Sequence, residues 1–396
     1  MADYTRENFI IYDNEFHSGI IEAEARNLNG FNAASNNTIR LQSMMSRGDF
    51  EKEAFYKKLD GVIQRRDVTS DSDVTALFLE QAEHVGIKIY RRSGPLRFTI
   101  DEFHTIMQDP SAGSVYFGQA IAEQKIKDQI DLALLSIQRS ISGIAAVNYD
   151  YSGTGAIAFA AINNALKKFG DRAMALNTIF MHSTPYFDLI ADGLDNYIVD
   201  TVAGASIVRG AAFAMGRTVI VMDSPSLTHN TLAYDGQTSN FTVGNYIVGD
   251  TSGARGDIVA DVDAGATGTL TLTNVDGIFE DDETLSEFEQ DGTPATGDGT
   301  VNGTLTTKYV TLLLQQDAAK ISDTKITTPW INRIMGKENL GYILQGELEY
   351  LVKIKGVSTG LTSISKYDDV KLGIASNWSQ IVTSHKNLPG VRLLTT

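Results

Sequence analysis

Residues 114–147 read SVYFGQAIAEQKIKDQIDLALLSIQRSISGIAAV, and the rest of the chain is organised around this stretch. Its apolar residues recur at steps of three and four with charged residues mostly between them, which is typical of an amphipathic helix. It contains no proline, and Pro110 lies just upstream, where a helix can begin. Such a helix would be a rod of about 50 Å. Because the apolar stripe lasts only about three heptads, we predict a spine helix between two flanking regions and not a coiled coil.

The composition is that of an ordinary soluble globular protein. The chain has 396 residues, of which 42 % are hydrophobic and 21 % are charged, so it has room for two or three domains. It contains no cysteine, which excludes disulfides and thiolate metal sites. Residues 1–8 lack an apolar run behind their charges, and no stretch approaches about eighteen consecutive apolar residues. We therefore expect no secretory signal, no membrane span and a cytosol-like compartment.

The negative charge is concentrated in one block. Residues 236–303 contain thirteen Asp or Glu and one base, Arg255, a net charge of −12, whereas the whole chain carries −16. Affinity for nucleic acid comes from bases that neutralise phosphates, so this block argues against a surface that grips DNA. The remainder of the chain is close enough to neutral to lie beside DNA without binding it tightly.

Residues 1–72 are predicted to form an N-terminal arm. Residues 27–37 (NLNGFNAASNN) form a polar, asparagine-rich break. Residues 38–67 have a helical spacing of apolar side chains, among them Phe50 and Phe55. Such a segment cannot bury its apolar residues alone, so we expect it to pack on another part of the chain or on a neighbouring copy.

Residues 85–99 (VGIKIYRRSGPLRFT) have the signature of a hairpin, after a short helical pattern over residues 74–84. Apolar residues alternate with others, including Lys88 and Tyr90, before a turn at residues 93–95. An ordinary two-stranded flap on its own domain is the alternative to a hairpin that reaches an acidic neighbour. The predicted exposed tip is basic and contains Arg91, Arg92 and Arg97.

The region after the spine alternates between helical and strand patterns. Helices are predicted over residues 156–169 and from Thr184, as N-cap before Pro185, to residue 194. Strands are predicted over residues 178–182, 215–225 (buried), 309–315 and 346–355.

Residues 238–307 interrupt this region with a different composition. The segment is rich in Gly, Thr and Asp and has short alternating runs with turns between them. This pattern predicts a small all-β insert. Because it lies between two strands of the host domain, it should project from a loop without disturbing the host core.

Three patterns resemble reactive or ligand sites, and each has a simpler interpretation. The G-x-G-x-x-A run at residues 153–158 lacks a convincing preceding strand for a dinucleotide site. The G-x-S-x-G run around Ser358, with Asp369 and His385 after it, lacks the helix that a nucleophile elbow needs. The acidic residues within 261–283 fail the EF-hand pattern and are better explained as solvated loops. We therefore predict no catalytic, cofactor-binding or metal-binding residues.

The order of these parts resembles that of a tailed-bacteriophage major capsid protein of the Hong Kong 97 type. Residues 177–194 (NTIFMHSTPYFDLIADGL) are similar to a strand and helix of its axial domain, and residues 209–225 (RGAAFAMGRTVIVMDSP) to the loop and strand that follow. Residues 371–396, which include the pair Asn377 and Trp378, resemble its C-terminal return. The resemblance covers nearly the whole chain except the insert.

The resemblance implies an α+β fold with an N-terminal arm, an extended hairpin, a long spine helix, a peripheral domain and an axial domain, to which this chain adds the small all-β insertion. The implied boundaries are residues 1–72 for the arm, 73–110 for the hairpin region, 111–151 and 359–396 for the peripheral domain, 152–237 and 308–358 for the axial domain, and 238–307 for the insertion.

The resemblance also implies a structural protein that is not an enzyme and needs no cofactor. Such a protein self-assembles into pentamers and hexamers of an icosahedral phage head that encloses double-stranded DNA without binding it specifically. The implied partners are other copies of the chain, a separate scaffolding protein, a portal and a decoration protein, and the implied location is the virion after assembly in the host cytoplasm. The alternatives are a tail adhesin, which the β insert would suit, and a serine hydrolase built on Ser358.

The arm and the hairpin are the elements that would gain stability by lying on a neighbouring subunit, where they bury apolar surface. Some relatives cross-link a hairpin lysine to a neighbour's asparagine, and Lys88 lies in the corresponding element. The candidate subunit contacts are Phe50, Phe55, Lys88, Tyr90, Arg91, Arg92 and Arg97.

Overall fold

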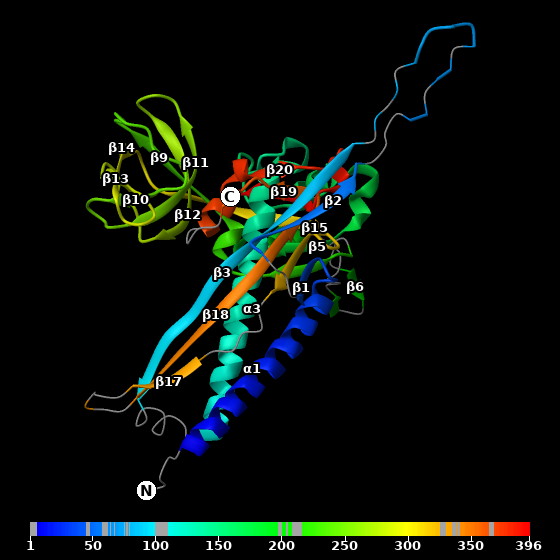
Figure 1. Cartoon of the computed structure of the whole chain (residues 1–396). Coiled ribbons are helices and arrows are strands. Elements are labelled where there is room, and N and C mark those ends of the chain that lie inside the picture. The colour runs from blue at the N-terminus through cyan, green and yellow to red at the C-terminus, as the bar shows by residue number, and fades with distance from the viewer. Residues whose placement is uncertain are drawn as a thin grey trace.

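The molecule is elongated, with two long helices and two long strands side by side below a wider body (Figure 1). A small β domain and a narrow loop extend from that body on opposite sides. No helix among the described residues is long and apolar enough to cross a membrane. The computed structural model describes residues 6–44, 48–57, 62–63, 65–66, 68–74, 76, 78, 80–99, 110–196, 200–202, 205–207, 216–324, 330–334, 338, 341–363 and 368–396.

The predicted spine helix is α3, Pro110–Ser142, which has 33 residues and is therefore about 50 Å long. Its apolar stripe is buried in the main hydrophobic core, as the spacing predicted, with Ile130, Ile137 and Ile141 among the buried side chains. The helix ends before the predicted stretch does, and Ala145–Val147 forms a separate 3₁₀ turn.

The arm begins with helix α1, Arg6–Ala34, which packs along α3 of the same chain (Figure 1). Ile20 is buried at this contact beside Ala122. The two helices approach closely at Gly19, where an added Cβ would lie 2.9 Å from the carbonyl oxygen of Val115. Part of the arm therefore rests on its own subunit.

The predicted break at residues 27–37 is wrong over most of its length, because α1 continues to Ala34. Leu28 and Phe31 pack against the main core, and this burial outweighs the low helix propensity of the asparagines around them. The chain leaves the helical path only at Asn36 and Asn37, which have positive φ angles of 52° and 54°. Asparagine tolerates this left-handed conformation better than most residues.

The first sheet has six strands in the order β1-β16-β18-β3-β2, and β17 also pairs with β18. The helix predicted for residues 38–67 is wrong, because this segment contributes β1 and β2. In β1 the buried side chains alternate with less buried ones, and the strand lies parallel to β16. The strands are β1 (Ile39–Ser43), β2 (Phe50–Tyr56), β3 (Gln81–Thr99), β16 (Ala319–Asp323), β17 (Trp330–Ile334) and β18 (Gly341–Ile354).

The hairpin predicted for residues 85–99 is also wrong, because they belong to β3, a single strand of 19 residues. β3 pairs with β18 on both sides of the expected turn, and a register shift between Leu344 and Gly346 accommodates the irregular residues there. The helix predicted for residues 74–84 is wrong too, since the strand begins at Gln81. The hairpin of the structure is formed instead by β2 and β3, and residues 57–80 connect them (Figure 1).

The second sheet has eleven strands and joins the α/β region to the insert. The predicted helices and strands of the α/β region are confirmed with shifted ends, although β8 is a half-buried edge strand and not a buried one. The helices are α4 (Phe159–Lys167) and α5 (Ser183–Asn196). The strands are β4 (Asn148–Asp150), β5 (Leu176–Met181), β8 (Thr218–Val221), β9 (Thr228–Asp235), β10 (Tyr246–Gly249), β11 (Arg255–Asp263), β12 (Gly268–Asp276), β13 (Thr284–Phe288), β14 (Pro294–Val301), β15 (Thr306–Gln315) and β21 (Gly390–Thr395).

The insert is an all-β unit with its own hydrophobic core, as predicted. The buried side chains include Phe241, Ile258 and Leu285, none of which belongs to the main core. Leu232 and Tyr234 of β9 are also part of this core, although they precede the predicted start of the insert at residue 238. Strands β9 and β15 pair with each other where the insert leaves the body.

The C-terminal part returns to the spine. Trp378 is buried there, and its indole nitrogen donates a hydrogen bond of 2.9 Å to the carbonyl oxygen of Leu372. The short elements are β6 (Asp200–Val202), which pairs with β7 (Ala205–Ile207), β19 (Val357–Thr359), which pairs with β20 (Trp378–Gln380), and α6 (Asp368–Leu372).

Candidate functional site

The connection between β2 and β3 extends far from the rest of the molecule (Figure 1). At its base, the backbone N–H of Lys57 donates to the carbonyl oxygen of Glu80 at 2.9 Å, and Lys57 Nζ lies 2.8 Å from Glu80 Oε2. The hydrogen bond from Lys57 Nζ and the positive charge of Lys57 lower the pKa of the Glu80 carboxyl. The two ends of the loop are therefore joined where it leaves the sheet.

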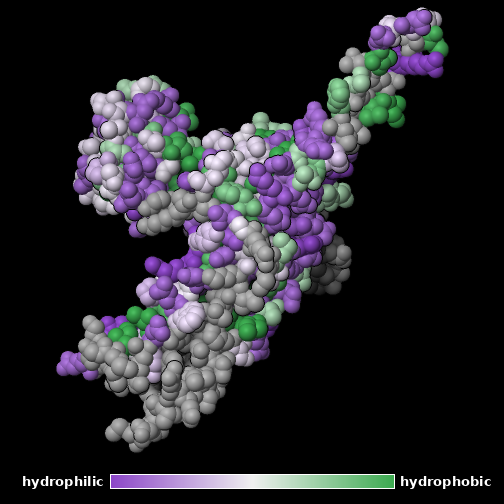
Figure 2. All heavy atoms as spheres, in the orientation of Figure 1, coloured by the Kyte–Doolittle hydropathy of each residue, from purple (hydrophilic) through white to green (hydrophobic). Residues whose placement is uncertain are grey.

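The described residues of this loop expose large apolar side chains (Figure 2). Ile63 is 97 % exposed and Phe78 is 85 % exposed. An apolar surface of this kind on a projecting segment marks a binding surface. The other exposed apolar side chains of the loop are Val62, Val68 and Val74, and Tyr56 is exposed at the end of β2.

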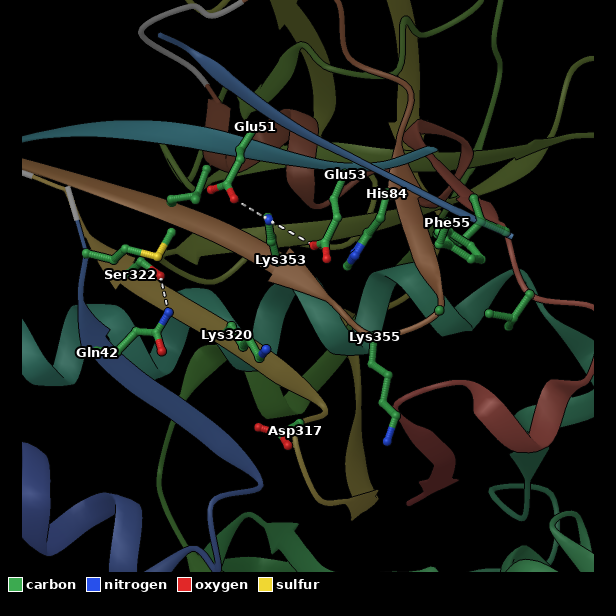
Figure 3. A pocket seen from close by; sticks show the side chains of 15 residues that line it. Gln42, Glu51, Glu53, Phe55, His84, Asp317, Lys320, Ser322, Lys353 and Lys355 are labelled. Carbon is green, nitrogen blue, oxygen red and sulfur yellow. Dashed lines mark hydrogen bonds and ion pairs between the residues drawn. The ribbon is translucent and has the colours of Figure 1, made fainter. Parts of the chain in front are cut away.

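A polar cavity of about 520 Å³ lies beside the β2–β3 hairpin (Figure 3). Lys353 Nζ of β18 lies 2.7 Å from Glu51 Oε1 and 3.6 Å from Glu53 Oε2, so it fastens β2 to the sheet. His84 Nε2 lies 2.9 Å from the carbonyl oxygen of Ile354, and burial lowers the pKa of this histidine. The hairpin is thus anchored on its own subunit while its loop extends away.

Lys88 and Tyr90, two of the predicted contact residues, make polar contacts within their own chain. Lys88 is only 5 % exposed, and its Nζ lies 3.3 Å from Glu349 Oε2. Lys88 is therefore buried in the single subunit, and its contact with a neighbouring subunit stays a prediction. Tyr90 is partly exposed, and its hydroxyl donates to Asp49 Oδ1 at 2.8 Å.

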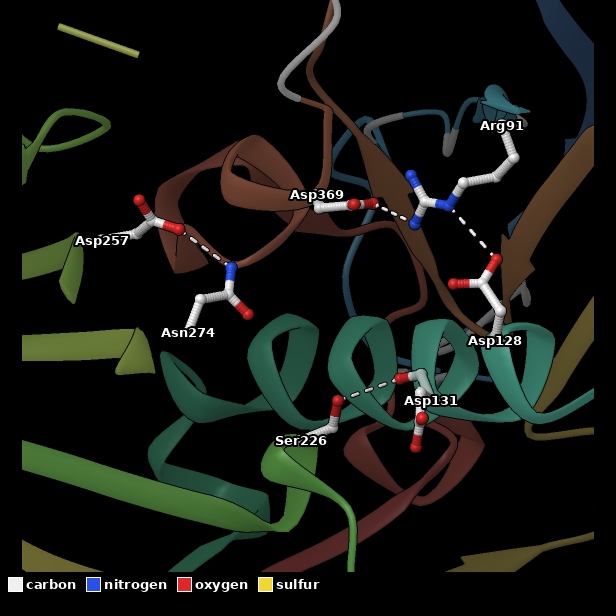
Figure 4. Close-up of polar contacts among 7 residues, drawn as sticks. All are labelled: Arg91, Asp128, Asp131, Ser226, Asp257, Asn274 and Asp369. Carbon is white, nitrogen blue, oxygen red and sulfur yellow. Dashed lines mark hydrogen bonds and ion pairs between the residues drawn. The ribbon is translucent and has the colours of Figure 1, made fainter. Parts of the chain in front are cut away.

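Arg91 does not belong to an exposed basic tip, which corrects the prediction for this residue. Its Nε lies 3.1 Å from Asp128 Oδ2 and its Nη2 lies 2.6 Å from Asp369 Oδ1 (Figure 4). Burial raises the pKa of Asp128, although Arg91 acts in the opposite direction. Arg92 and Arg97 are exposed, as predicted, and stay candidate contacts with a neighbouring subunit.

The two phenylalanines of β2 have different surroundings. Phe50 is partly buried and packs against the main core. Phe55 is also partly buried and lines the polar cavity near the end of the hairpin from which the loop extends (Figure 3). Neither side chain lies in the loop itself, and the most exposed loop residues, Ile63 and Phe78, were not among the predicted contacts. Ile63 and Phe78 lie within the helical patterns assigned to residues 38–67 and 74–84, which predicted buried helix faces and not an exposed loop.

The three residues of the hydrolase alternative each make a separate structural contact. Ser358 Oγ accepts a hydrogen bond of 3.0 Å from the backbone N–H of Val85. Asp369 pairs with Arg91, as described above, and His385 Nε2 lies 3.1 Å from the carbonyl oxygen of Lys168. These contacts favour a structural role for all three residues.

Another serine, histidine and aspartate lie together at the start of α5. His182 Nδ1 is 3.5 Å from Ser183 Oγ, and His182 Nε2 is 3.5 Å from Asp223 Oδ1. The backbone N–H of Thr184 also donates to His182 Nδ1 at 3.3 Å, and Asp223 accepts the N–H of Ser183 at 3.1 Å. The helix thus uses these side chains to satisfy its first N–H groups, which have no partner within the helix.

The acidic residues of the insert accept hydrogen bonds inside it. Asp261 accepts from the hydroxyl of Tyr234 at 3.0 Å, and buried Glu283 accepts from the backbone N–H of Ser252 at 2.9 Å. In the part of the chain that the structure describes, no three acidic or histidine side chains are grouped as a metal site would need.

Solved capsid structures show a distant likeness to the chain. The acid-stable capsid of Helicobacter pylori bacteriophage KHP30 is 11 % identical, with a TM-score of 0.43 over 91 % of this chain and 88 % of that one. The capsid of Ralstonia phage GP4 is 9 % identical, with a TM-score of 0.41 over 91 % of this chain and 87 % of that one. No curated protein matches the sequence.

A family model gives the identification. The model for Gp13-like proteins, described as major capsid protein 13-like, matches residues 8–260 and 290–392. The gap between the two matched segments falls within the β insert. The predicted α+β class, with its long spine helix and its small all-β insertion, is confirmed by the structure. Because the match covers most of its length, the chain belongs to the Gp13-like family of major capsid proteins.

Proposed function

We propose that this phage major capsid protein forms pentamers and hexamers of an icosahedral head, and that the loop of residues 57–80 binds a neighbouring subunit. The exposure of Ile63 and Phe78 on a projecting segment supports this proposal. Burying one such side chain contributes about 1.5–3 kcal/mol, so two of them give a moderate contact that is repeated around each ring. A ring closes when one surface of each copy binds a different surface of the next.

The anchoring of the loop suits this role. The ion pairs of Lys353 fix the β2–β3 hairpin to the sheet. Because the base of the hairpin is already ordered, binding of the loop to a neighbouring subunit does not carry that entropic cost. The loop itself is long enough to follow the small angular differences between five-fold and six-fold rings. The same surface then serves both kinds of ring.

Scaffolding, portal and decoration proteins complete the proposed set of partners, and assembly takes place in the host cytoplasm. Packaged double-stranded DNA is confined by the shell and not held by a basic surface. The net charge of −16 supports this view, because the 49 acidic residues outnumber the 33 basic ones that could neutralise phosphates. We expect purified subunits to bind duplex DNA weakly at physiological salt, and submicromolar binding would contradict that part of the proposal.

The insert is proposed to be a surface decoration of the head. Its separate hydrophobic core supports this proposal. The pairing of β9 with β15 supports it too, because these two strands stay hydrogen-bonded to each other at the point where the insert leaves the body. Replacing residues 233–304 with a short turn should leave a subunit that still assembles. Loss of all assembly in a subunit that remains folded would show that the insert is a required contact.

The loop proposal is tested with the double variant Ile63→Asp/Phe78→Asp. It should fold with the stability of the unmodified subunit, since neither side chain packs on the body, but it should form at least tenfold fewer shells with scaffold in electron micrographs and sedimentation. Ile278→Asp is the matched control, because Ile278 is similarly exposed but lies in the insert. Normal yields of shells from the double variant would overturn the proposed role of the loop.

A further inference from the structure

Two arginines that lie near each other are buried without an acidic partner among the residues that the structure describes. Arg139 lies in the last turn of α3 and Arg392 lies in β21, and each is only 4 % exposed. Within the described chain, Nε and Nη2 of Arg139 and Nε of Arg392 contact no acceptor. Arg392 Nη1 donates to Asn148 Oδ1 at 3.0 Å, which satisfies one donor but neutralises no charge.

The sheet register places two more basic residues on the same side as Arg392. Arg392 is opposite Leu312 of β15, and Lys308 is four residues earlier in that strand, so their side chains point to one face. Lys308 is in turn opposite His229 of β9. His229 Nδ1 is buried without a hydrogen-bond partner among the described residues.

The groups are close enough to affect one another's ionisation. Burial, helped by the charge of Arg392, lowers the pKa of Arg139 to about 9. Burial lowers the pKa of Arg392 to about 10. Burial, together with the charges of Arg392, Arg139 and Lys308, lowers the pKa of His229 to about 3, so its imidazole is neutral at pH 7.

The acid whose charge reaches this group is Asp150 of β4. Its Oδ1 already accepts hydrogen bonds from the backbone N–H of Ser152 at 2.9 Å and from the Ser152 hydroxyl at 2.6 Å. Asp150 is also exposed, so it offsets the buried positive charges only in part. Arg139, Arg392 and Lys308 thus carry three positive charges against one carboxylate.

A buried charge without a partner is strongly unfavourable, and two adjacent ones of the same sign are more so. We propose that Arg139, Arg392, Lys308 and His229 form a binding site for a small tetrahedral oxyanion of the phosphate or sulfate class, enclosed between α3 and the sheet. The planar forks of the two arginines suit the oxygens of such an ion, and its charge removes their repulsion. The site requires no neighbouring subunit, so it is testable on the free chain whether or not the proposed shell contacts are correct.

The test is thermal unfolding of the full-length subunit as inorganic phosphate replaces chloride at constant ionic strength. A ligand that binds only the folded state raises the melting temperature with its concentration. We expect a rise of about 2–4 °C between 1 and 100 mM phosphate, and a saturable binding curve by calorimetry. Absence of a phosphate-dependent rise, or one that never saturates, would overturn the proposal.

The variants Arg139→Met and Arg392→Met separate binding from a merely structural role. Each should lose the phosphate-dependent rise and yet melt in chloride at or above the temperature of the unmodified subunit, because a buried like-charge repulsion is gone. Arg26→Met is the matched control, since Arg26 is exposed on α1, and it should respond to phosphate normally. A methionine variant that retains the full response would contradict the site.

If a methionine variant fails to fold, Arg392→Lys replaces it. This variant keeps the charge but loses the fork, so calorimetry should give at least threefold weaker phosphate binding. Unchanged affinity would overturn the assignment. If phosphate has no effect on the free chain, the oxyanion site is wrong even where Arg392→Met prevents shell formation.

Discussion

Arg91 Nη2 lies 2.6 Å from Asp369 Oδ1, and this ion pair joins β3 to α6 although the two residues are 278 positions apart. Arg91 Nε also reaches Asp128 of the spine helix, so one guanidinium fixes the long strand, the spine and the C-terminal return (Figure 4). These three elements belong to the body of the subunit, from which the β2–β3 loop projects (Figure 1). The position of that loop therefore depends on polar contacts that are remote from it.

Arg91→Met should lower the free energy of unfolding by about 1–2 kcal/mol, because Asp128 and Asp369 lose their shared partner. The effect is at the low end for a buried pair, since both carboxylates are more than a third exposed. Urea unfolding measures it, and Arg92→Met, at the exposed neighbouring position, should change stability by less than about 0.5 kcal/mol. In a double-mutant cycle with Asp369→Asn, strictly additive effects would contradict a direct ion pair.

Lys125→Met should destabilise the subunit by about 3 kcal/mol. Lys125 of α3 is almost fully buried and pairs with Glu24 of α1 at 2.9 Å and with Asp323 of β16, so its loss leaves two carboxylates without this partner. Hydrogen exchange should also become faster in α1, since this contact holds the arm on the spine. Lys127→Met, two residues away and exposed, is the control, and equal effects of the two substitutions would count against the buried pair.

Ser358→Ala should cost about 1–3 kcal/mol of stability, because the backbone N–H of Val85 then loses its acceptor. The control is Ser379→Ala, whose exposed hydroxyl makes only a 3.4 Å contact with the carbonyl oxygen of Ser358. Chemical denaturation compares the two variants. If both had the same small effect, the hydrogen bond to Val85 would not contribute to the fold as described.

The insert should lose stability in acid through Glu283. Burial acts to raise the pKa of Glu283, but N–H donors from Ser252, Glu280 and Thr251 outweigh it and lower the pKa below its ordinary value of 4.5. A carboxyl with a depressed pKa contributes stability at neutral pH, and that contribution is lost as the pH falls through the folded-state pKa. The protection factors of the insert's amides, which compare the observed exchange rate with the intrinsic rate at the same pH, should therefore fall between about pH 5 and pH 3.

Glu283→Gln should make the insert less stable at pH 7, by about 1–3 kcal/mol, and should weaken its acid sensitivity. Gly249 lies against this carboxylate, so the nearly isosteric Gln amide has no room to turn its NH2 group away from the N–H donors that Glu283 accepts. Glu280→Gln, at an exposed position, should behave like the unmodified chain. An unchanged pH profile in Glu283→Gln would assign the acid sensitivity to other carboxyls.

Parts of the fold were predictable because their information is local. The spine helix follows from the spacing of residues such as Ile130, Ile137 and Ile141, since helix hydrogen bonds join residues four apart and one face suffices to bury them. The all-β insert follows from its alternating runs and its composition. For the candidate site, the presence of an extended hairpin was predicted but its position was not. The hairpin was expected at residues 85–99 and is formed by residues 50–87.

The sequence by itself determined the helical spine, the β insert and the absence of thiol chemistry, because each depends on neighbouring residues or on composition alone. The tertiary structure decided which segments became β1, β2 and β3, because a strand takes its hydrogen bonds from partners such as β16 and β18, far away in the chain. It also decided that Lys88 is buried against Glu349, 261 positions away, and that Arg139 lies beside Arg392. Charge and burial at these sites are set by packing between distant segments, which no local pattern encodes.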